Sequence, residues 1–190
     1  MEKKNERPTK LIIVLGYNGT GKTTLVKKTV LNELRHNRRA LIVTPDDAEW
    51  QTIEAVHPKW PERIKNYVGA RRIIYYNGLL PIITENYRNG LLIFDDCRAY
   101  LTASLDMDLH NLMIRRRQKM IDIIAVGHGF TEVPPKFFTF ASHIILFRTI
   151  DNIERRKNVL RDFAEMKAAQ EAVNHIAETQ NPYHYQIINQ

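Results

Sequence analysis

One stretch near the start of the chain constrains the fold more than any other: an apolar run over residues 11–15, followed at once by Gly-Tyr-Asn-Gly-Thr-Gly-Lys-Thr over residues 16–23. Gly, four residues and then Gly-Lys-Thr is the spacing of the phosphate-binding loop called Walker A or the P-loop. The run before it has no polar alternation, which favours a strand buried on both faces. Apolar residues then recur at helical spacing over residues 25–34. The loop is therefore predicted between a strand and a helix, and an ordinary glycine-rich turn is the lesser alternative.

Such a loop has a defined chemistry. Its glycines let the backbone wrap phosphate oxygens with inward-pointing N–H groups, and the start of the following helix adds a partial positive charge. We expect Lys22 to reach the β and γ phosphates of a nucleotide and Thr23 to place its hydroxyl on Mg2+. The sequence thus predicts a site for ATP and Mg2+. The expected nucleotide-binding residues are Gly16, Asn18, Gly19, Thr20, Gly21, Lys22, Thr23 and Thr24.

Two carboxylates follow a second apolar run. Residues 91–94 are Leu-Leu-Ile-Phe, and Asp95 and Asp96 come next. A buried strand of this kind delivers a carboxylate to the carboxyl edge of a parallel sheet, beside the P-loop, as in the Walker B pattern. We expect Asp95 to hold Mg2+ through its water shell and Asp96 to be the general base that orients the attacking water. Acids that merely begin a turn are the alternative.

A histidine ends another predicted strand. Residues 121–126 form a largely apolar run that leads into Gly127-His128-Gly129. At the carboxyl edge of a sheet, His128 would touch the γ phosphate or the attacking water, so we expect it to act in catalysis as a sensor of that phosphate. An exposed histidine in a glycine-flanked turn is the alternative.

The rest of the chain alternates between predicted strands and helices, which indicates an α/β protein with a mostly parallel central sheet in three layers. Asp151 is expected to cap a long amphipathic helix that ends near Asn181, and residues 183–190 form a tail without a predicted structure. Gly90 is expected just past the end of a helix. The remaining strands are predicted over residues 39–44, 72–76 and 143–148, and the remaining helices over residues 46–56, 81–88 and 105–117.

The length of 190 residues suits one domain. We expect residues 1–150 to form the P-loop core, with residues 1–10 as a frayed lead-in, and residues 151–190 to add a helix and tail to the same domain. No apolar run approaches the roughly 20 residues that span a bilayer. The single cysteine, Cys97, excludes an internal disulfide and a multi-cysteine zinc site. We therefore expect a cytoplasmic protein, with peripheral association with a membrane as a further option.

The net charge of +7 favours polyanionic partners. Basic residues cluster at 36–39, 71–72, 115–119 and 155–157. Each cluster by itself is compatible with a solvated face. Together they indicate a track for nucleic acid.

At this point the chain resembles the FtsK and HerA superfamily of P-loop ATPases, and within it the proteins similar to the zonular occludens toxin ATPase domain of filamentous phages. The resemblance covers about residues 10–150 and implies a RecA-like sheet with a strand inserted between the two Walker strands. It further implies assembly into a ring, a hexamer being one option, and ATP hydrolysis coupled to moving DNA or assembling phage. The implied partners are DNA, further copies of the chain, and a phage or membrane-associated assembly partner. The residues that carry the resemblance are 16–23, 89–96, 115–117, 122–128 and 144–148.

The resemblance also bears on individual residues. Asp96 stands where the family usually has glutamate and His128 where glutamine or threonine is usual, so we expect altered rates and not an inactive enzyme. One of Arg115, Arg116 and Arg117 is implied to act as a catalytic arginine finger on the nucleotide of a neighbouring subunit. A basic helix end that complements the helix dipole is the alternative.

Three functions follow in order of expectation. The first is a homo-oligomeric ATPase motor that acts on DNA in translocation, packaging or phage assembly. The second is a nucleotide or small-molecule kinase, in which the arginines at 115–117 would form a lid over phosphates. The third is an interaction module in which a bound nucleotide only organises a surface. A switch GTPase is disfavoured, because the chain lacks an Asn-Lys-x-Asp motif.

Overall fold

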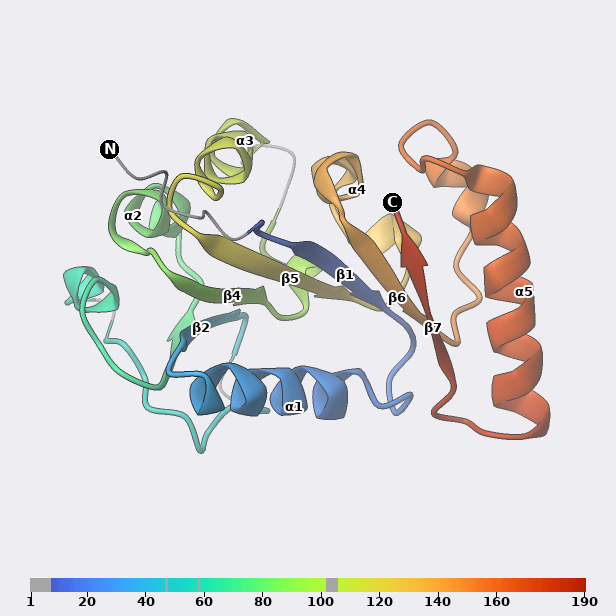
Figure 1. Cartoon of the computed structure of the whole chain (residues 1–190), viewed down its shortest axis with the longest axis horizontal. Coiled ribbons are helices and arrows are strands. Elements are labelled where there is room, and N and C mark those ends of the chain that lie inside the picture. Colours follow the sequence, from blue (N-terminus) through green and yellow to red (C-terminus); the bar gives the residue numbers. More distant parts are fainter. Residues whose placement is uncertain (1–7, 47, 58, 102–105) are drawn as a thin grey trace.

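The computed structural model describes residues 8–46, 48–57, 59–101 and 106–190. Its seven strands form one sheet, and the first six run parallel, as predicted, while the last is antiparallel to its neighbour (Figure 1). The strands are β1 (Leu11–Leu15), β2 (Arg39–Thr44), β3 (Ala70–Ile74), β4 (Gly90–Phe94), β5 (Ile121–Gly127), β6 (His143–Phe147) and β7 (Tyr185–Asn189). Their spatial order is β3-β2-β4-β5-β1-β6-β7.

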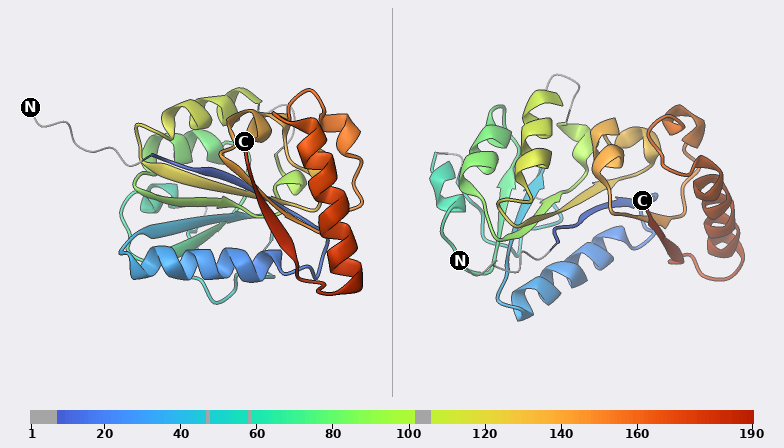
Figure 2. Two further views of the ribbon diagram at one scale, coloured as in Figure 1. Left: turned by 45° about the vertical axis from the view of Figure 1, so that its right-hand side comes forward. Right: turned by 45° about the horizontal axis from the view of Figure 1, so that its top comes forward.

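The helices cover both faces of this sheet and give the three layers that the sequence predicts. One helix lies on one face and three lie on the other, and the last helix lies beside β6 and β7 (Figures 1 and 2). In chain order they are α1 (Lys22–Arg35), α2 (Leu79–Asn86), α3 (Asp106–Arg115), α4 (Pro135–Phe140) and α5 (Phe163–Thr179). Short 3-10 helices span Pro61–Ile64, Cys97–Ala99, Phe130–Glu132 and Ile153–Arg156.

The unbroken apolar run of β1 follows from this layering. Leu11, Ile13 and Leu15 pack into a core shared with α2, α3 and α4. Val14 packs on the other face, in a cluster that includes Val26 of α1. A strand with neighbours on both faces has no solvated side, and burial of each such side chain contributes about 1.5–3 kcal/mol.

Strand β5 lies between β1 and β4, so the two Walker strands are not neighbours. Leu15 of β1 pairs with Gly127 of β5, and Phe94 of β4 pairs with Ala125 of β5. This confirms the inserted strand that the resemblance implies. Because all three strands are parallel, their carboxyl ends meet at one edge of the sheet, which we call the nucleotide edge.

The helix predicted over residues 46–56 is absent from the described part of that stretch, in which residues 48–52 form consecutive turns. The Asp46 carboxylate accepts a hydrogen bond from the Ala48 N–H (2.9 Å) and so supports a turn. Farther on, the Val56 N–H donates to the Arg72 carbonyl (2.7 Å) and the Arg72 N–H to the Glu54 carbonyl (3.0 Å). The segment thus runs alongside β3 in an extended form, and these sheet-like bonds replace the helical ones.

Two neighbouring elements each lie two residues earlier in the chain than predicted. β3 spans Ala70–Ile74 instead of 72–76, and α2 spans Leu79–Asn86 instead of 81–88. Gly90 is the first residue of β4 and not the residue just past a helix end. The helix predicted to begin at Leu105 is described from Asp106, because residues 102–105 lie outside the described residues.

The C-terminal part of the chain departs further from the prediction. Asp151 does not cap the long helix: its carboxylate accepts hydrogen bonds from the Thr131 N–H (2.5 Å) and hydroxyl (2.9 Å). The helix begins later, at Phe163, and Asp162 caps it by accepting from the Glu165 N–H (2.9 Å). The tail then adds β7 to the sheet, which the sequence analysis did not predict. Among the described residues, no helix is both long and apolar enough to cross a membrane.

The start of the described chain is held more firmly than a frayed lead-in. The Lys10 N–H donates to the Asp122 carboxylate at 2.7 Å. Thr9 accepts from the guanidinium of Arg116. Residues 1–7 lie outside the described residues.

Candidate nucleotide and catalytic site

The P-loop connects the end of β1 to the start of α1 at the nucleotide edge. Gly16 is crowded: a Cβ at this residue would lie 2.5 Å from the Phe147 Cβ. Gly19 and Gly21 have φ angles of +78° and +98°, which side chains rarely permit. Gly21 directly precedes α1 and no side chain caps the helix there, which leaves its first N–H groups available to a phosphate. The exposed Thr24 lies in this first turn.

Lys22 is buried beneath the loop, with a relative exposure of 7%. Its ammonium group donates to the Tyr17 carbonyl at 2.7 Å. Burial lowers the pKa of Lys22, and the nearby carboxylates of Asp95, Glu49 and Asp96 oppose that change. The ammonium is therefore partly desolvated and oriented along the loop, where a phosphate oxygen would be a stronger partner than a carbonyl.

Asp95 follows the last residue of β4 and is 9% exposed. One carboxylate oxygen accepts a hydrogen bond of 2.6 Å from the indole N–H of Trp50. Burial raises the pKa of Asp95, while the bond from Trp50 lowers it. The Tyr100 hydroxyl donates to the Asp95 carbonyl at 3.0 Å and so fixes the backbone there. Side chain and backbone of Asp95 are both held in place.

Asp96 and His128 come together although 31 residues separate them in sequence, because β4 and β5 are neighbours. The His128 Nε2 and Asp96 Oδ1 atoms lie 3.7 Å apart. Asp96 adopts a left-handed backbone conformation, with φ +44° and ψ +54°. For a residue with a side chain this costs on the order of 1 kcal/mol. Backbone strain of this kind is often retained at functional sites.

These side chains line a single cavity of about 260 Å³ at the nucleotide edge, together with Asn18 and Thr23. Of the residues that the sequence singled out, the cavity thus brings together Asn18, Lys22, Thr23, Asp95, Asp96 and His128. Four carboxylates line the cavity, those of Asp46, Glu49, Asp95 and Asp96, against the one ammonium of Lys22. Phosphates alone would be repelled by this excess of negative charge.

The donor set fits a magnesium ion. The Thr23 hydroxyl lies 2.9 Å from the carboxylate of Glu49, and Asp95 lies across the same cavity. Magnesium prefers oxygen ligands and is commonly shared between one or two carboxylates and substrate phosphates. A divalent cation placed among these oxygens would also offset the acidic excess.

The arginines are not part of this cavity. They lie at the end of α3, just before β5 begins, and hence at the edge of the sheet opposite the nucleotide edge. Arg116 is 2% exposed and donates to the Thr9 hydroxyl at 2.7 Å. It therefore cannot reach another subunit in this structure, which corrects the prediction that it is a candidate finger. Arg115 pairs with Glu85 at 2.5 Å, and Arg117 is exposed.

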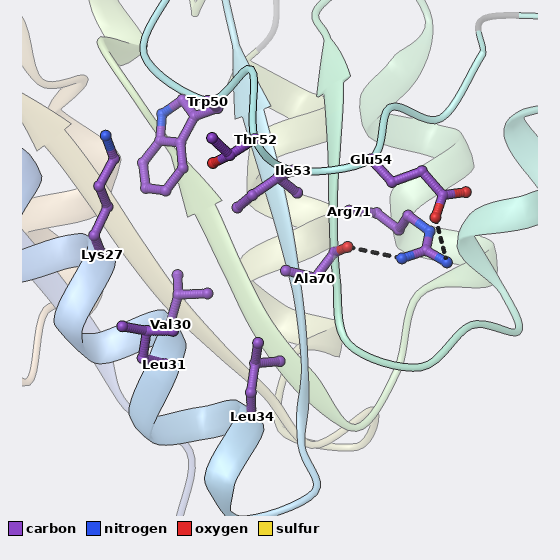
Figure 3. A pocket seen from close by; sticks show the side chains of 10 residues that line it. All are labelled: Lys27, Val30, Leu31, Leu34, Trp50, Thr52, Ile53, Glu54, Ala70 and Arg71. Atoms are coloured by element: carbon purple, nitrogen blue, oxygen red, sulfur yellow. Dashed lines mark hydrogen bonds and ion pairs between the residues drawn. The ribbon is translucent and has the colours of Figure 1, made fainter.

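Trp50 was not among the predicted site residues. It is 1% exposed, its indole N–H binds Asp95 of the nucleotide cavity, and it also lines an apolar pocket of about 510 Å³ beside α1. Figure 3 shows its ring facing this pocket, with Lys27 close by, and the ammonium of Lys27 lies 5.4 Å from the ring centroid. Trp50 thus anchors the turn that carries Glu49. Glu49 was not among the predicted site residues either. Both residues fall within the stretch predicted as helix, so neither was expected at the site.

Replacing Trp50 by phenylalanine should destabilise the protein by about 1–3 kcal/mol at neutral pH, because the buried Asp95 carboxylate would lose its N–H donor. Loss of this donor also raises the pKa of Asp95 further above its unfolded value. A carboxyl with a raised folded pKa destabilises the native state only where it is ionised, so the effect should shrink as the pH falls through that pKa. Urea unfolding at neutral and mildly acidic pH measures the loss of stability and its dependence on pH.

Trp60 supplies the matched control, because it is 51% exposed. Trp60→Phe should leave the free energy of unfolding nearly unchanged at either pH. An equal, pH-independent loss in Trp50→Phe would mean that only packing was disturbed.

The strand order and the glycine-rich loop between β1 and α1 define a P-loop NTPase fold. No protein-family model matches the sequence, and no curated protein matches it. The structure is similar to the genome packaging NTPase B204 from Sulfolobus turreted icosahedral virus 2 in complex with AMPPCP, with a TM-score of 0.68 and 17% identity over 96% of this chain and 93% of that one.

Two further solved structures are similar. The DNA-packaging ATPase B204 from Sulfolobus turreted icosahedral virus has a TM-score of 0.65 and 14% identity, covering 95% of this chain and 97% of that one. The N-terminal domain of zonular occludens toxin from Neisseria meningitidis has a TM-score of 0.43 and 12% identity, covering 73% and 76% of the two chains. The two packaging proteins confirm, at the level of the fold, the resemblance to P-loop ATPases found in the sequence.

Proposed function

We propose that this chain is an ATPase motor of the FtsK and HerA type that acts on DNA and works as a homo-oligomer. The observation that carries the proposal is the convergence of Lys22, Thr23, Asp95, Asp96 and His128 on one cavity. The similar packaging proteins are named as a genome packaging NTPase and a DNA-packaging ATPase, and they match this chain over nearly its whole length. The net charge of +7 suits a polyanionic partner.

Each residue has a proposed role in hydrolysis. The P-loop amides and Lys22 hold the phosphates and neutralise negative charge as the terminal phosphoryl group leaves. Asp96 orients the attacking water and accepts its proton. His128, 3.7 Å from Asp96, donates a hydrogen bond to the γ phosphate or the water. Thr23 and Asp95 would hold Mg2+, which supplies further neutralisation of phosphate charge.

The other two functions have less support. A kinase lid formed by residues 115–117 would have to close over the nucleotide, but these arginines lie at the opposite edge of the sheet and Arg116 is buried. An interaction module would not need Asp96 and His128 to meet in the cavity that Lys22 lines. An arginine supplied by a neighbouring subunit, with Arg115 and Arg117 as candidates, remains part of the proposal.

Asp96→Asn tests the proposed chemistry. We expect ATP hydrolysis to fall on the order of 100-fold, because an amide cannot accept the proton, while the affinity for ATP stays within about threefold. Steady-state phosphate release and binding of a fluorescent ATP analogue measure the two quantities. Asp46→Asn removes the same charge from the same cavity and should change hydrolysis little. Comparable losses in both variants would show that charge alone matters and would remove Asp96 as the base.

The same assay tests the motor. Hydrolysis should be stimulated by single- or double-stranded DNA at low salt, and the stimulation should fade at high salt because phosphate contacts release counterions. Hydrolysis by a monomer without any response to DNA would contradict a DNA motor and leave only an ATPase.

A further inference from the structure

A basic cleft lies at the edge of the sheet opposite the nucleotide edge. It measures about 700 Å³, and its lining includes Arg38, Arg39, Lys65 and Arg88 but no acidic residue. Arg39 is the first residue of β2, and Arg88 lies two residues before the start of β4. The two edges of the sheet therefore differ in charge: carboxylates dominate one cavity and cations the other.

The side chain of Arg39 holds together the segments that form the cleft. Its guanidinium lies 5.2 Å from the ring centroid of Tyr67 and 4.8 Å from that of Tyr87. It donates to the Lys65 carbonyl at 2.6 Å and to the Arg88 carbonyl at 2.9 Å. The half-buried Arg39 thus fixes the backbone of the two loops that carry Lys65 and Arg88.

The four cations are not equivalent. Arg38 is neutralised, because it pairs with Glu33 at 2.5 Å and with Asp122 at 2.9 Å. Lys65 and Arg88 are exposed, and within the part of the chain that the structure describes neither side chain has an ion-pair or hydrogen-bond partner. Lys65 and Arg88 are therefore the charges that the cleft offers to an external anion.

Like charge continues beyond the cleft. The Asn89 N–H donates to the Lys119 carbonyl at 2.8 Å, which places Lys119 beside the Arg88 loop. Burial lowers the pKa of Lys119, the attraction of Glu85 opposes it, and the positive charges of Arg88 and Arg115 lower it further by less. Three cations thus lie near Glu85, and a bound polyanion would add to the neutralisation that this one carboxylate provides.

We propose that this basic cleft binds the phosphodiester backbone of nucleic acid, with Lys65 and Arg88 each contacting a phosphate. The side-chain amides of Asn37, Asn66 and Asn89 line the same cleft and can donate to phosphate or sugar oxygens. Two guanidinium groups, of Arg39 and Arg71, already lie over the Tyr67 ring, so contact with the backbone is favoured over base stacking. The partner rests on the proposed DNA motor, whereas the location rests on the cleft alone.

The experiment measures the affinity of the whole chain for a fluorescent single-stranded oligonucleotide and a duplex, without nucleotide, over a series of salt concentrations. The double variant Lys65→Ala, Arg88→Ala should bind roughly tenfold more weakly, and its log-log salt slope should fall by about 2 because two phosphate contacts are lost. Binding of the fluorescent ATP analogue should be unchanged, since the nucleotide cavity lies at the opposite edge.

Lys28→Ala, Arg161→Ala is the matched control, because both residues are exposed and lie outside the basic clusters, and the same charge is removed elsewhere. Equal weakening in both double variants, or none in the first, would overturn the proposal.

Wild-type binding to anionic phospholipid vesicles but not to DNA would assign the cleft to a membrane surface instead. DNA binding that is lost in the first variant without any stimulation of hydrolysis would keep the cleft and reject the motor. Stimulation of hydrolysis by DNA that persists in Lys65→Ala, Arg88→Ala would keep the motor and reject the cleft as its DNA site.

Discussion

Lys22→Ala should reduce ATP turnover by on the order of 100-fold or more while the protein stays folded. The ammonium of Lys22 is the only cation that lines the described nucleotide cavity, so alanine leaves developing phosphate charge facing four carboxylates. Stability should not suffer, because burial lowers the pKa of Lys22 and keeping that ammonium charged opposes folding. Phosphate release measures the turnover, and thermal unfolding without nucleotide measures the stability.

Lys28→Ala is the control, because Lys28 lies on an exposed position of the same helix. It should turn over ATP at nearly the wild-type rate. Turnover that persists in Lys22→Ala would refute the site assignment, and unfolding of that variant would show that Lys22 supports the loop itself.

Gly90→Ala is expected to produce the largest loss of stability, about 3 kcal/mol, at the upper end of what overpacking costs. A Cβ at Gly90 would lie 2.3 Å from the Tyr87 hydroxyl and 2.7 Å from the Arg39 carbonyl. The hydroxyl is already committed to the Leu91 carbonyl at 2.9 Å, and the Arg39 carbonyl belongs to the neighbouring strand of the sheet. Neither atom can move without disturbing β2 or β4. Urea unfolding measures the change.

Gly69→Ala separates crowding from backbone strain. Gly69 has a φ of +84°, and a Cβ there would meet nothing within 4 Å. Its replacement should therefore cost only about 1–2 kcal/mol, the price of a left-handed conformation. If the two variants lose equal stability, the crowding at Gly90 has relaxed without cost and the packing argument is wrong.

The sequence predicted the parts of the fold that periodicity and local chemistry determine. Strands buried on both faces, such as β1 and β4, appear as unbroken apolar runs, and the glycine spacing at 16–23 is fixed by the backbone that must wrap phosphate. The meeting of Asp95, Asp96 and His128 followed because parallel strands end at one edge. Their catalytic roles stay predictions until the variants above are measured.

The predictions were wrong where contacts with distant parts of the chain determine the local structure. The stretch after β2 contains apolar residues at helical spacing, yet its Trp50 is bound to Asp95, 45 residues away, and its end runs beside β3. Asp151 is a residue type that often caps helices, but it accepts hydrogen bonds from Thr131 of the 3-10 helix that follows β5. Strand β7 has a single buried residue, Ile188, and its place is set by pairing with β6. Such contacts leave no local periodicity in the sequence.

The unequal charges in the nucleotide cavity have a kinetic consequence. Four carboxylates and one ammonium form a field that rejects free tetra-anionic nucleotide but admits a complex whose charge is already halved by a divalent cation. We therefore expect metal and nucleotide to arrive as a pair. Excess chelator should then slow association itself and not only the chemical step.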